Sequence, residues 1–583
     1  MSIRFDVSTV PIQGGYIAKQ CPVRIQNDVL RPAEPVVVFS ADSVMRMTDG
    51  ILFEASVFDE LRAAASPDWV FIDEDLGRAE AVSATVAAME AGAGLIAGGW
   101  LPLDETGRRT GKPDLLIRFG GGYVPVDVKH HLTLEVTEDG SVSISSLLSP
   151  SPEWAESRLG WSRRKRRDDA LQLAHYRRML EACGHASISM RAGIVGKERV
   201  VVWYDLDEPI WRTPAKSEGK KRKLRTSMEI YDFEFGFRLD IAAIAQQVLD
   251  QASVDLLVEP VWSGECPECP WVDYCSLTLR AGSGDPSLLP SVGYKEWKVL
   301  RDHGITDRAG VAGLSYRTAR LLTSKVDPEE LLDLDSTTEA FGSVAFLGNA
   351  ILNARAATGE LPVSRLPGKT GAEVARADIE LDVDMESTND GVYLWGVLIT
   401  DRANTGLVES GYLPFVSFDP IDSAGEVEVF RTFWNWLSDL LAKGAATGVT
   451  INAYCWYSGA ENTQMRRIAA RDPIVAAEVA GFIASPLWID MHEVFKASWI
   501  TGDSLGLKAI APLAGHTWPV DDPGGGLSMV KHVEATTLPG GDSVRDDARR
   551  WLLDYNRGDV EATLHIREWL DQEGSTWPQV DAS

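Results

Sequence analysis

The chain has 583 residues, a length that corresponds to about three to five domains at roughly 150 residues each. Its 57 basic and 85 acidic side chains give a net charge of −28, and 45% of its residues are apolar. This composition excludes a disordered chain, a collagen-like chain and a small disulfide-stapled one, and the acidity argues against coating nucleic acid by overall charge. No run approaches the roughly 20 apolar residues of a membrane helix, and the first residues lack a signal-peptide pattern, so we expect a cytoplasmic protein without a membrane partner.

Four of the six cysteines form the first candidate site. Three of them lie close together in the run CPECPWVDYC, and Cys21 lies far upstream. Four thiolates hold an iron–sulfur cluster or a zinc ion. One remote cysteine with a compact trio favours a [4Fe–4S] cluster, with zinc or unliganded core cysteines as the alternatives. The predicted ligands are Cys21, Cys266, Cys269 and Cys275, whereas Cys183 and Cys455 lie in apolar runs and are predicted to be buried.

A candidate catalytic strand lies between these cysteines, in GKPDLLIRFGGGYVPVDVKHH. Two short strands are predicted on either side of the glycines at 120–122. Asp127 and Lys129 share one strand face because strand side chains alternate, and Asp114 opens the preceding strand. Two carboxylates and a lysine at a sheet edge suit phosphodiester cleavage: the carboxylates hold Mg²⁺ or Mn²⁺, and the lysine neutralises charge or positions water.

A basic-led amphipathic helix is predicted downstream, in RRKRRDDALQLAHYRRML, with Gln172 and Tyr176 on one face. The ordered set of Asp114, D-x-K, Q-x3-Y and the flanking cysteines resembles the RecB-like branch of the PD-(D/E)XK nucleases, including AddB-type helicase–nuclease subunits. The resemblance covers residues 10–283. It implies a restriction-endonuclease-like fold, Asp114 and Asp127 as metal ligands, Lys129 as a catalytic residue, and Gln172 and Tyr176 as supports of the site or of DNA.

One part of that family pattern is missing. The family often has a helical histidine before the first aspartate, and no histidine precedes His130 here. Glu60 in SVFDELRAA is our predicted replacement as a metal ligand, with Glu80 as its rival. A solvated helix face explains either acid equally well.

The next segments carry weaker signals. Basic clusters at 163–167 and 220–225 are either phosphate contacts beside the site or solvated charge. Residues 284–370 are predicted to be helical; their Gly-Ile rhythm is similar to helix-hairpin-helix units, with a plain connector as the alternative. Residues 362–371 are predicted to be a linker.

The C-terminal third opens with a predicted strand, ADIELDVDMES. Its apolar residues alternate with acids, so Asp384 and Glu386 share a face at the strand end. Asp378, Glu380 and Asp382 are expected to form an exposed acidic face.

A late predicted helix, WLLDYNRGDVEATLHIREWL, places Tyr555 and Asp559 one turn apart. A D-x-E strand followed by a Y-x3-D helix resembles the DEDDy branch of the DnaQ-like exonucleases, over residues 375–570. The resemblance implies an RNase H-like fold, two metal ions held by four acids, a tyrosine that positions water, and 3′→5′ polarity. The implied ligands are Asp384, Glu386 and Asp559, with Glu461 as the second-motif acid and Asp490 as its alternative.

Together these patterns predict an α/β multidomain protein. Its parts are a RecB-like PD-(D/E)XK nuclease with a cysteine-held cluster (1–283), a helical connector (284–370) and an RNase H-like exonuclease domain (371–583), a layout that resembles a bacterial group of RecB-like nucleases. No phosphate-binding G-x4-GK[ST] loop occurs, so unwinding would need a helicase partner. We expect a metal-dependent nuclease acting on DNA single strands or ends in repair, recombination or defence. The alternatives are a non-catalytic nucleic-acid-binding subunit and RNA processing by the C-terminal domain.

Overall fold

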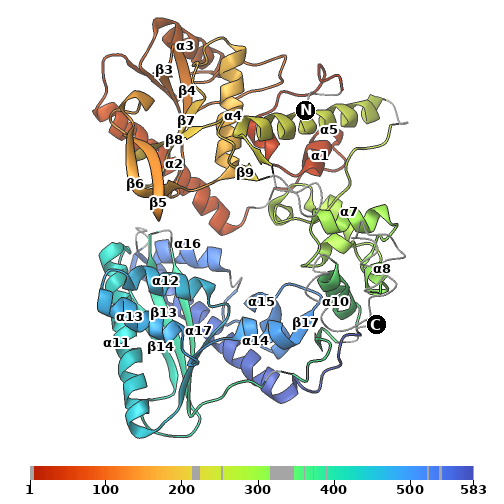
Figure 1. The fold of residues 1–583 in the computed structure, drawn as a ribbon, viewed down its shortest axis with the longest axis vertical. Coiled ribbons are helices and arrows are strands. Elements are labelled where there is room, and N and C mark those ends of the chain that lie inside the picture. The colour runs from red at the N-terminus through yellow and green to blue at the C-terminus, as the bar shows by residue number, and fades with distance from the viewer. Residues whose placement is uncertain are drawn as a thin grey trace. The chain divides into compact units, whose positions relative to one another are not determined.

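The computed structural model describes residues 5–37, 39–212, 223–250, 254–315, 347–359, 361–371, 373–388, 390–521, 524–536 and 541–581. The chain is a mixed α/β protein that divides into two compact units (Figure 1). Unit 1 comprises Met1–Phe39, Val44–Pro260 and Gly264–Tyr274, and unit 2 comprises Ser40–Ser43, Val261–Ser263 and Cys275–Ser583. Across these described ranges, no helix has both the length and the apolar character needed to cross a bilayer.

Unit 1 is built on a mixed sheet of eight strands in the order β1-β2-β3-β4-β7-β8-β5-β6. The strands are β1 Trp69–Phe71, β2 Leu95–Ala97, β3 Leu115–Phe119, β4 Gly122–Val128, β5 Leu134–Ser146, β6 Glu156–Arg163, β7 Arg191–Val195 and β8 Val200–Asp205, and β9 Trp211–Arg212 pairs separately with β10 Leu224–Arg225. The helices are η1 Gly15–Ala18, α1 Pro22–Leu30, α2 Ala41–Ala63, α3 Arg78–Ala91, η2 Pro152–Trp154, α4 Arg167–Ala182, α5 Ser227–Asp250, η3 Cys266–Glu268 and α6 Val272–Leu279, the last of which runs across the division between the units.

The predicted strand pair around the glycine run is confirmed as the hairpin β3–β4. Gly120 and Gly121 have φ of 55° and 77°, the left-handed conformation that a tight hairpin turn requires and that glycine adopts without steric cost. The sequence pattern suggested one buried face, but every residue of β4 is buried. Its valines pack in one core cluster with Val57 and Phe58 of α2, and α4 contacts the same strand. The face that carries Asp127 therefore lies inside the unit.

Unit 2 holds a second mixed sheet, with strand order β14-β13-β12-β15-β16. β12 pairs antiparallel with β13, which pairs antiparallel with β14, while β12, β15 and β16 run parallel. The strands are β11 Val363–Arg365, β12 Ile379–Ser387, β13 Val392–Asp401, β14 Gly411–Val416, β15 Ile451–Cys455, β16 Trp488–Asp490 and β17 Trp499–Thr501. The helices are η4 Pro286–Leu288, α7 Tyr294–Asp302, α8 Arg308–Ala312, α10 Gly348–Ala357, α11 Ser423–Thr447, α12 Gly459–Ala469, α13 Pro473–Ile483, α14 Met491–Ser498, α15 Leu507–Ile510, η6 Ala511–Ala514, α16 Gly525–Thr536 and α17 Gly541–Glu573.

The middle segment is helical where it is described. α7 and α8 are joined by a turn at Gly304, whose φ is 76°, and together with α10 they share one small apolar core. α8 has only five residues, and 316–346 lie outside the described residues, so the helix-hairpin-helix likeness stays a prediction. The expected linker at 362–371 is in part wrong. Its residues Val363–Arg365 form strand β11, which pairs antiparallel with β17.

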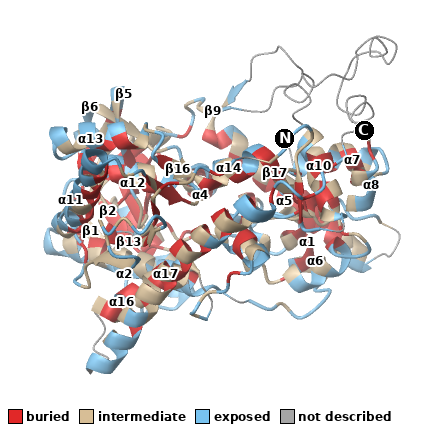
Figure 2. Ribbon diagram, turned by 90° about the horizontal axis from the view of Figure 1, so that it is seen from below, coloured by how far each residue is buried: buried red, intermediate tan, exposed pale blue. Residues whose placement is uncertain are grey.

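The acidic face of β12 is covered, contrary to the expectation of exposure. Glu380 and Asp382 have no exposed surface. The long helix α17 packs across this face and brings Arg567, itself fully buried, into ion pairs with both acids. Over residues 551–570 of α17, buried residues alternate with partly exposed ones (Figure 2). Periodicity identified the strand, but the alternation alone does not reveal whether a distant arginine covers its polar face.

Candidate metal centres

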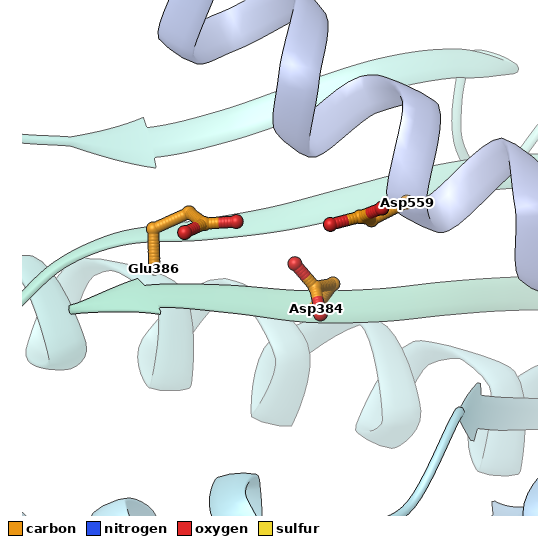
Figure 3. A group of neighbouring side chains, drawn as sticks. All are labelled: Asp384, Glu386 and Asp559. Carbon is orange, nitrogen blue, oxygen red and sulfur yellow. The ribbon is translucent and has the colours of Figure 1, made fainter. Parts of the chain in front are cut away.

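The strongest candidate site lies at the end of β12. Asp384 and Glu386 extend from this strand, and Asp559 extends towards them from α17 (Figure 3). One carboxylate oxygen from each of the three residues lies within 4.8 Å of the others. Within the described ranges this is the one group of three or more His, Cys, Asp or Glu side chains with ligand atoms at that spacing. The structure thus brings together three of the predicted ligands from residues that are far apart in the sequence.

Neighbouring polar groups hold two of these carboxylates in place. Asn556 Nδ2 donates to Asp384 Oδ2 at 2.8 Å, and the hydroxyl of Tyr412 donates to the Asn556 carbonyl oxygen at 2.8 Å. Ser528 Oγ donates to Glu386 Oε2 at 2.9 Å. Gly396, opposite Asp384 on β13, allows this approach, because a Cβ there would collide with Asn556 Oδ1. None of these supporting residues has a motif-like spacing in the sequence, which is why sequence reasoning missed them.

Asp559 has its own set of donors. Trp518 Nε1 donates to its Oδ1 at 2.7 Å, and Lys508 Nζ forms an ion pair with the same oxygen. The Tyr555 hydroxyl also acts on Asp559 as a hydrogen-bond partner. The predicted pair Tyr555 and Asp559 is therefore brought together, and Lys508 and Trp518 are additions that the sequence did not suggest.

The electrostatics of the triad are unfavourable without a cation. Burial raises the pKa of Asp384 well above its usual range, and the neighbouring charges of Asp559, Glu386 and Glu461 raise it further. Burial and Asp559 raise the pKa of Glu386 to about 8. Carboxylates that share a site resist simultaneous ionisation, and a divalent cation bound between them removes that penalty. The donor set of carboxylate oxygens fits Mg²⁺ or Mn²⁺.

The structure distinguishes between the two candidates for the fourth acid. Asp490 is the N-cap of α14, and its carboxylate accepts backbone hydrogen bonds from four residues: Tyr457, Ser458, His492 and Glu493. Glu461, in the first turn of α12, is 4% exposed, and its Oε2 has no hydrogen-bond partner among the described residues. Its charge acts on Asp384, and burial raises its own pKa to about 7. Asp490 thus has a structural role as a cap, whereas the charge of Glu461 acts on Asp384 although its oxygens lie outside the converging group of three.

A second candidate centre lies on β4 in unit 1. Asp114 Oδ2 accepts a hydrogen bond from the backbone N–H of Val128 at 2.6 Å. Lys129 Nζ lies 2.7 Å from Asp127 Oδ2, and Asp127 Oδ1 has no hydrogen-bond partner in the described part of the chain. Burial and the charge of Asp127 raise the pKa of Asp114 well above its usual range. The predicted set Asp114, Asp127 and Lys129 is brought together.

The predicted helix contributes to the same centre. Lys129 Nζ donates to Gln172 Oε1 at 3.1 Å, and Gln172 Nε2 donates to the Tyr176 hydroxyl at 2.8 Å. Both α4 residues are nearly fully buried. The chain of hydrogen bonds from Tyr176 through Gln172 fixes the position of the Lys129 ammonium group. Gln172 and Tyr176 therefore support the site from behind.

The helical acid at this centre is Glu54, and not Glu60. Glu60 forms an ion pair with Arg199 at 3.1 Å, and Glu80 is exposed on α3, so the structure brings neither to the carboxylates. Glu54 lies six residues before Glu60 on α2, and its charge acts on Asp114. Burial raises the pKa of Glu54, and the nearby charges of Lys112 and Asp127 also act on it. Glu54 in GILFEAS carried no distinguishing pattern among the acids of this helix.

The cysteines are partly brought together. Cys21 is the N-cap of α1, and Cys266 and Cys269 lie at the two ends of η3. Burial raises the pKa of the Cys21 thiol, and the charge of Cys266 acts on both Cys21 and Cys269. Cys275 lies on α6. Thiolates around one zinc ion would lie about 4 Å apart, given a Zn–S distance of about 2.3 Å. No such compact group forms within the described residues, where the six cysteines also form no disulfide.

The two basic clusters give little support for phosphate contacts beside the site. Arg163 and Arg167 form ion pairs with Glu208 and Glu234, so part of the first cluster is neutralised within the unit. Residues 220–222 of the second cluster lie outside the described residues.

No protein-family model, curated protein or solved structure matches the chain. The functional inference therefore rests on the chain's own geometry and on the resemblances of its sequence motifs.

Proposed function

We propose that the chain is a metal-dependent nuclease that cleaves DNA phosphodiesters at single strands or ends, with one carboxylate centre in each unit. The observation that carries the proposal is the buried triad of Asp384, Glu386 and Asp559, whose oxygens converge at a cation's spacing beside the Tyr555 hydroxyl. Bound Mg²⁺ or Mn²⁺ would polarise the phosphate and lower the pKa of water. The nuclease resemblances of both units supply the substrate class. Repair, recombination or defence is the proposed setting, with a helicase partner where unwinding is needed.

In the unit 2 centre the chain's own residues would orient the reactants. Burial and the neighbouring carboxylates raise the pKa of Tyr555, so its hydroxyl stays protonated at neutral pH. A neutral hydroxyl beside Asp559 can hold a water molecule as acceptor or donor without adding negative charge. The DEDDy resemblance assigns this position to the attacking water and implies 3′→5′ polarity. The strand order of the unit 2 sheet, with acids at the end of its central strand, supports the RNase H-like assignment.

In the unit 1 centre Lys129 would stabilise the scissile phosphate. The neighbouring carboxylates of Asp127 and Asp114 raise its pKa, so the ammonium group stays charged. Gln172 holds that group in place from the side of α4. Glu54, Asp114 and Asp127 would hold the cation, and the cysteines would hold a [4Fe–4S] cluster that closes the unit around this centre. The PD-(D/E)XK assignment of unit 1 belongs to the same proposal.

The test is cleavage of end-labelled single-stranded DNA and RNA with Mn²⁺ by the wild type, Lys129→Ala, Asp384→Asn and the double variant. Glu60→Gln is the matched control, because Glu60 lies outside both centres. Loss of cleavage in Lys129→Ala alone assigns the activity to unit 1, and loss in Asp384→Asn alone assigns it to unit 2. Cleavage of RNA without cleavage of DNA would show that the substrate is RNA and not DNA. A wild type that binds DNA but cuts neither substrate would overturn the enzyme proposal in favour of a binding subunit.

A further inference from the structure

Lys508 places a positive charge inside the unit 2 centre. It lies on α15, and its Nζ forms an ion pair with Asp559 Oδ1. The same ammonium group lies 4.1 Å from the ring centroid of Trp518 and 4.6 Å from that of Tyr555. Cations near two aromatic faces are held by the ring quadrupoles, so the lysine is fixed by three partners and not by Asp559 alone.

Two of the donors to Asp559 share one of its oxygens. Lys508 and Trp518 both use Oδ1 of Asp559. A cation bound through Oδ2 of Asp559, together with Asp384 and Glu386, would therefore not have to displace the lysine. The ammonium group and the cation would then act on the same carboxylate from two sides.

The charges of the centre balance with one divalent ion. Three ionised carboxylates carry three negative charges, and Lys508 offsets one of them. One divalent cation neutralises the remaining two, whereas two such ions would leave a surplus of positive charge beside the ammonium group. Like charges a few ångströms apart in a partly buried site repel each other. Glu461, the fourth acid, is not among the three whose oxygens converge.

We propose that Lys508 stands in the place of a second metal ion, so that the unit 2 centre holds a single divalent cation. This inference rests on the proposed metal-dependent function of that centre. It assigns to Lys508 a contact with the substrate phosphate that a second ion would otherwise make, because its side chain is 37% exposed while Asp559 is 7% exposed. The side chain at position 508 therefore decides whether the unit 2 centre holds one metal ion or two.

The experiment is Mn²⁺ binding to the full chain, by calorimetry and electron paramagnetic resonance. Asp114→Asn with Asp127→Asn forms the background, so that the unit 1 centre does not contribute. In this background we expect one bound ion with the spectrum of an isolated Mn²⁺, and its loss on adding Asp384→Asn. Lys508→Met should take up a second ion with the spectrum of a coupled pair, while Lys508→Arg should keep one. Thermal unfolding of each variant shows that it is folded.

The outcomes separate the inference from the function on which it rests. Two ions bound with Lys508 intact would overturn the inference and leave the metal centre standing; this result needs no variant at 508. One ion in a folded Lys508→Met would also overturn it. Ions that remain bound after Asp384→Asn would show that the triad is not the metal site, and the proposed function of this centre would fall.

Discussion

At the scale of single residues, one strand shows two ways of burying carboxylates. Glu380, Asp382, Asp384 and Glu386 share one face of β12 because strand side chains alternate. Tyr555, Asp559 and Arg567 share one face of α17, spaced by multiples of four residues. Arg567 forms ion pairs with Glu380 and Asp382, and Arg376 also pairs with Glu380. Asp384 and Glu386 lie instead beside a third carboxylate, that of Asp559, so their charge requires a cation from outside the chain.

The buried ion pairs of Arg567 predict a large effect on the stability of unit 2. Arg567→Met should destabilise unit 2 by about 3–5 kcal/mol, because Asp382 would stay buried without its arginine partner. The control is Arg402→Met, which removes an arginine that also pairs with Glu380 but is 41% exposed; we expect a loss of about 1 kcal/mol or less. Chemical denaturation measures both. Equal losses of stability in the two variants would contradict the view that the buried pairing of Arg567 is the stabilising one.

The position of the helical acid gives a second prediction at this scale. In an Asp384→Asn background, Glu54→Gln should weaken Mn²⁺ binding at the unit 1 centre by at least about tenfold, because it removes a charge directed at Asp114. Glu60→Gln should leave the affinity unchanged, because Glu60 pairs with Arg199. Calorimetry distinguishes the two variants. Weakening by Glu60→Gln alone would restore that acid as the ligand.

At the scale of elements, α4 joins the unit 1 centre to the buried interior. Its His175 has no exposed surface; the Tyr231 hydroxyl donates to Nδ1 at 2.8 Å, and Nε2 donates to the carbonyl oxygen of Thr110 at 2.9 Å. The carbonyl oxygen of Thr110 requires a proton on Nε2, and burial lowers the pKa of the imidazole, which favours the neutral ring. One turn of the same helix thus carries both the support of Lys129 and a histidine that is held uncharged.

This histidine predicts an acid-sensitive unit. Burial lowers the pKa of His175 to about 4, from 6.5 in the unfolded chain. The unfolded state therefore binds the proton first as pH falls. The stability contribution is complete above about pH 6.5 and is lost progressively down to about pH 4, by on the order of 3 kcal/mol. His175→Gln should lack this component in denaturation measured from pH 7 to pH 4, with His185→Gln as the control. If the free energy of unfolding of His175→Gln fell with pH as steeply as that of the wild type, the prediction would be refuted.

At the scale of the whole molecule, each unit contains its own candidate carboxylate centre, and the proposed cluster ligands come from distant parts of the chain. Cys21 begins α1, and its backbone N–H donates to Glu265 at 2.7 Å, next to Cys266. A cluster at this place would fix the N-terminal segment to residues 266–269. Because Tyr16 of η1 interacts with Lys129, the same segment reaches the unit 1 centre.

Loss of a cluster ligand should therefore affect colour and stability together. Protein purified without oxygen is expected to be brown, and Cys21→Ser or Cys266→Ser should bleach it and lower the thermal unfolding temperature. Cys183→Ser is the control, because Cys183 lies at the end of α4, outside this group. Visible absorbance, iron content and thermal unfolding are the measurements. Colourless wild-type protein with stoichiometric zinc would rule out the cluster.

The sequence by itself determined the features that depend on short separations. The hairpin at Gly120 and Gly121, the pairing of Gln172 with Tyr176, and the turn of helix that joins Tyr555 to Asp559 follow from local periodicity and turn chemistry. Asp127 with Lys129, and Asp384 with Glu386, follow from the alternation of a strand. These local rules identified most of the residues that the structure gathers at the two centres.

Only the tertiary structure decided which distant side chains complete the centres. Six residues of helix turn the side chain by about 240°, so the rotation of α2 decides between Glu54 and Glu60. The backbone donors around Asp490 assign it to a helix cap and leave Glu461 as the acid whose charge acts on Asp384. Lys508 and Arg567 reach their carboxylates through the packing of α15 and α17. Burial and long-range charge set these choices, and neither is encoded in the spacing of residues along the chain.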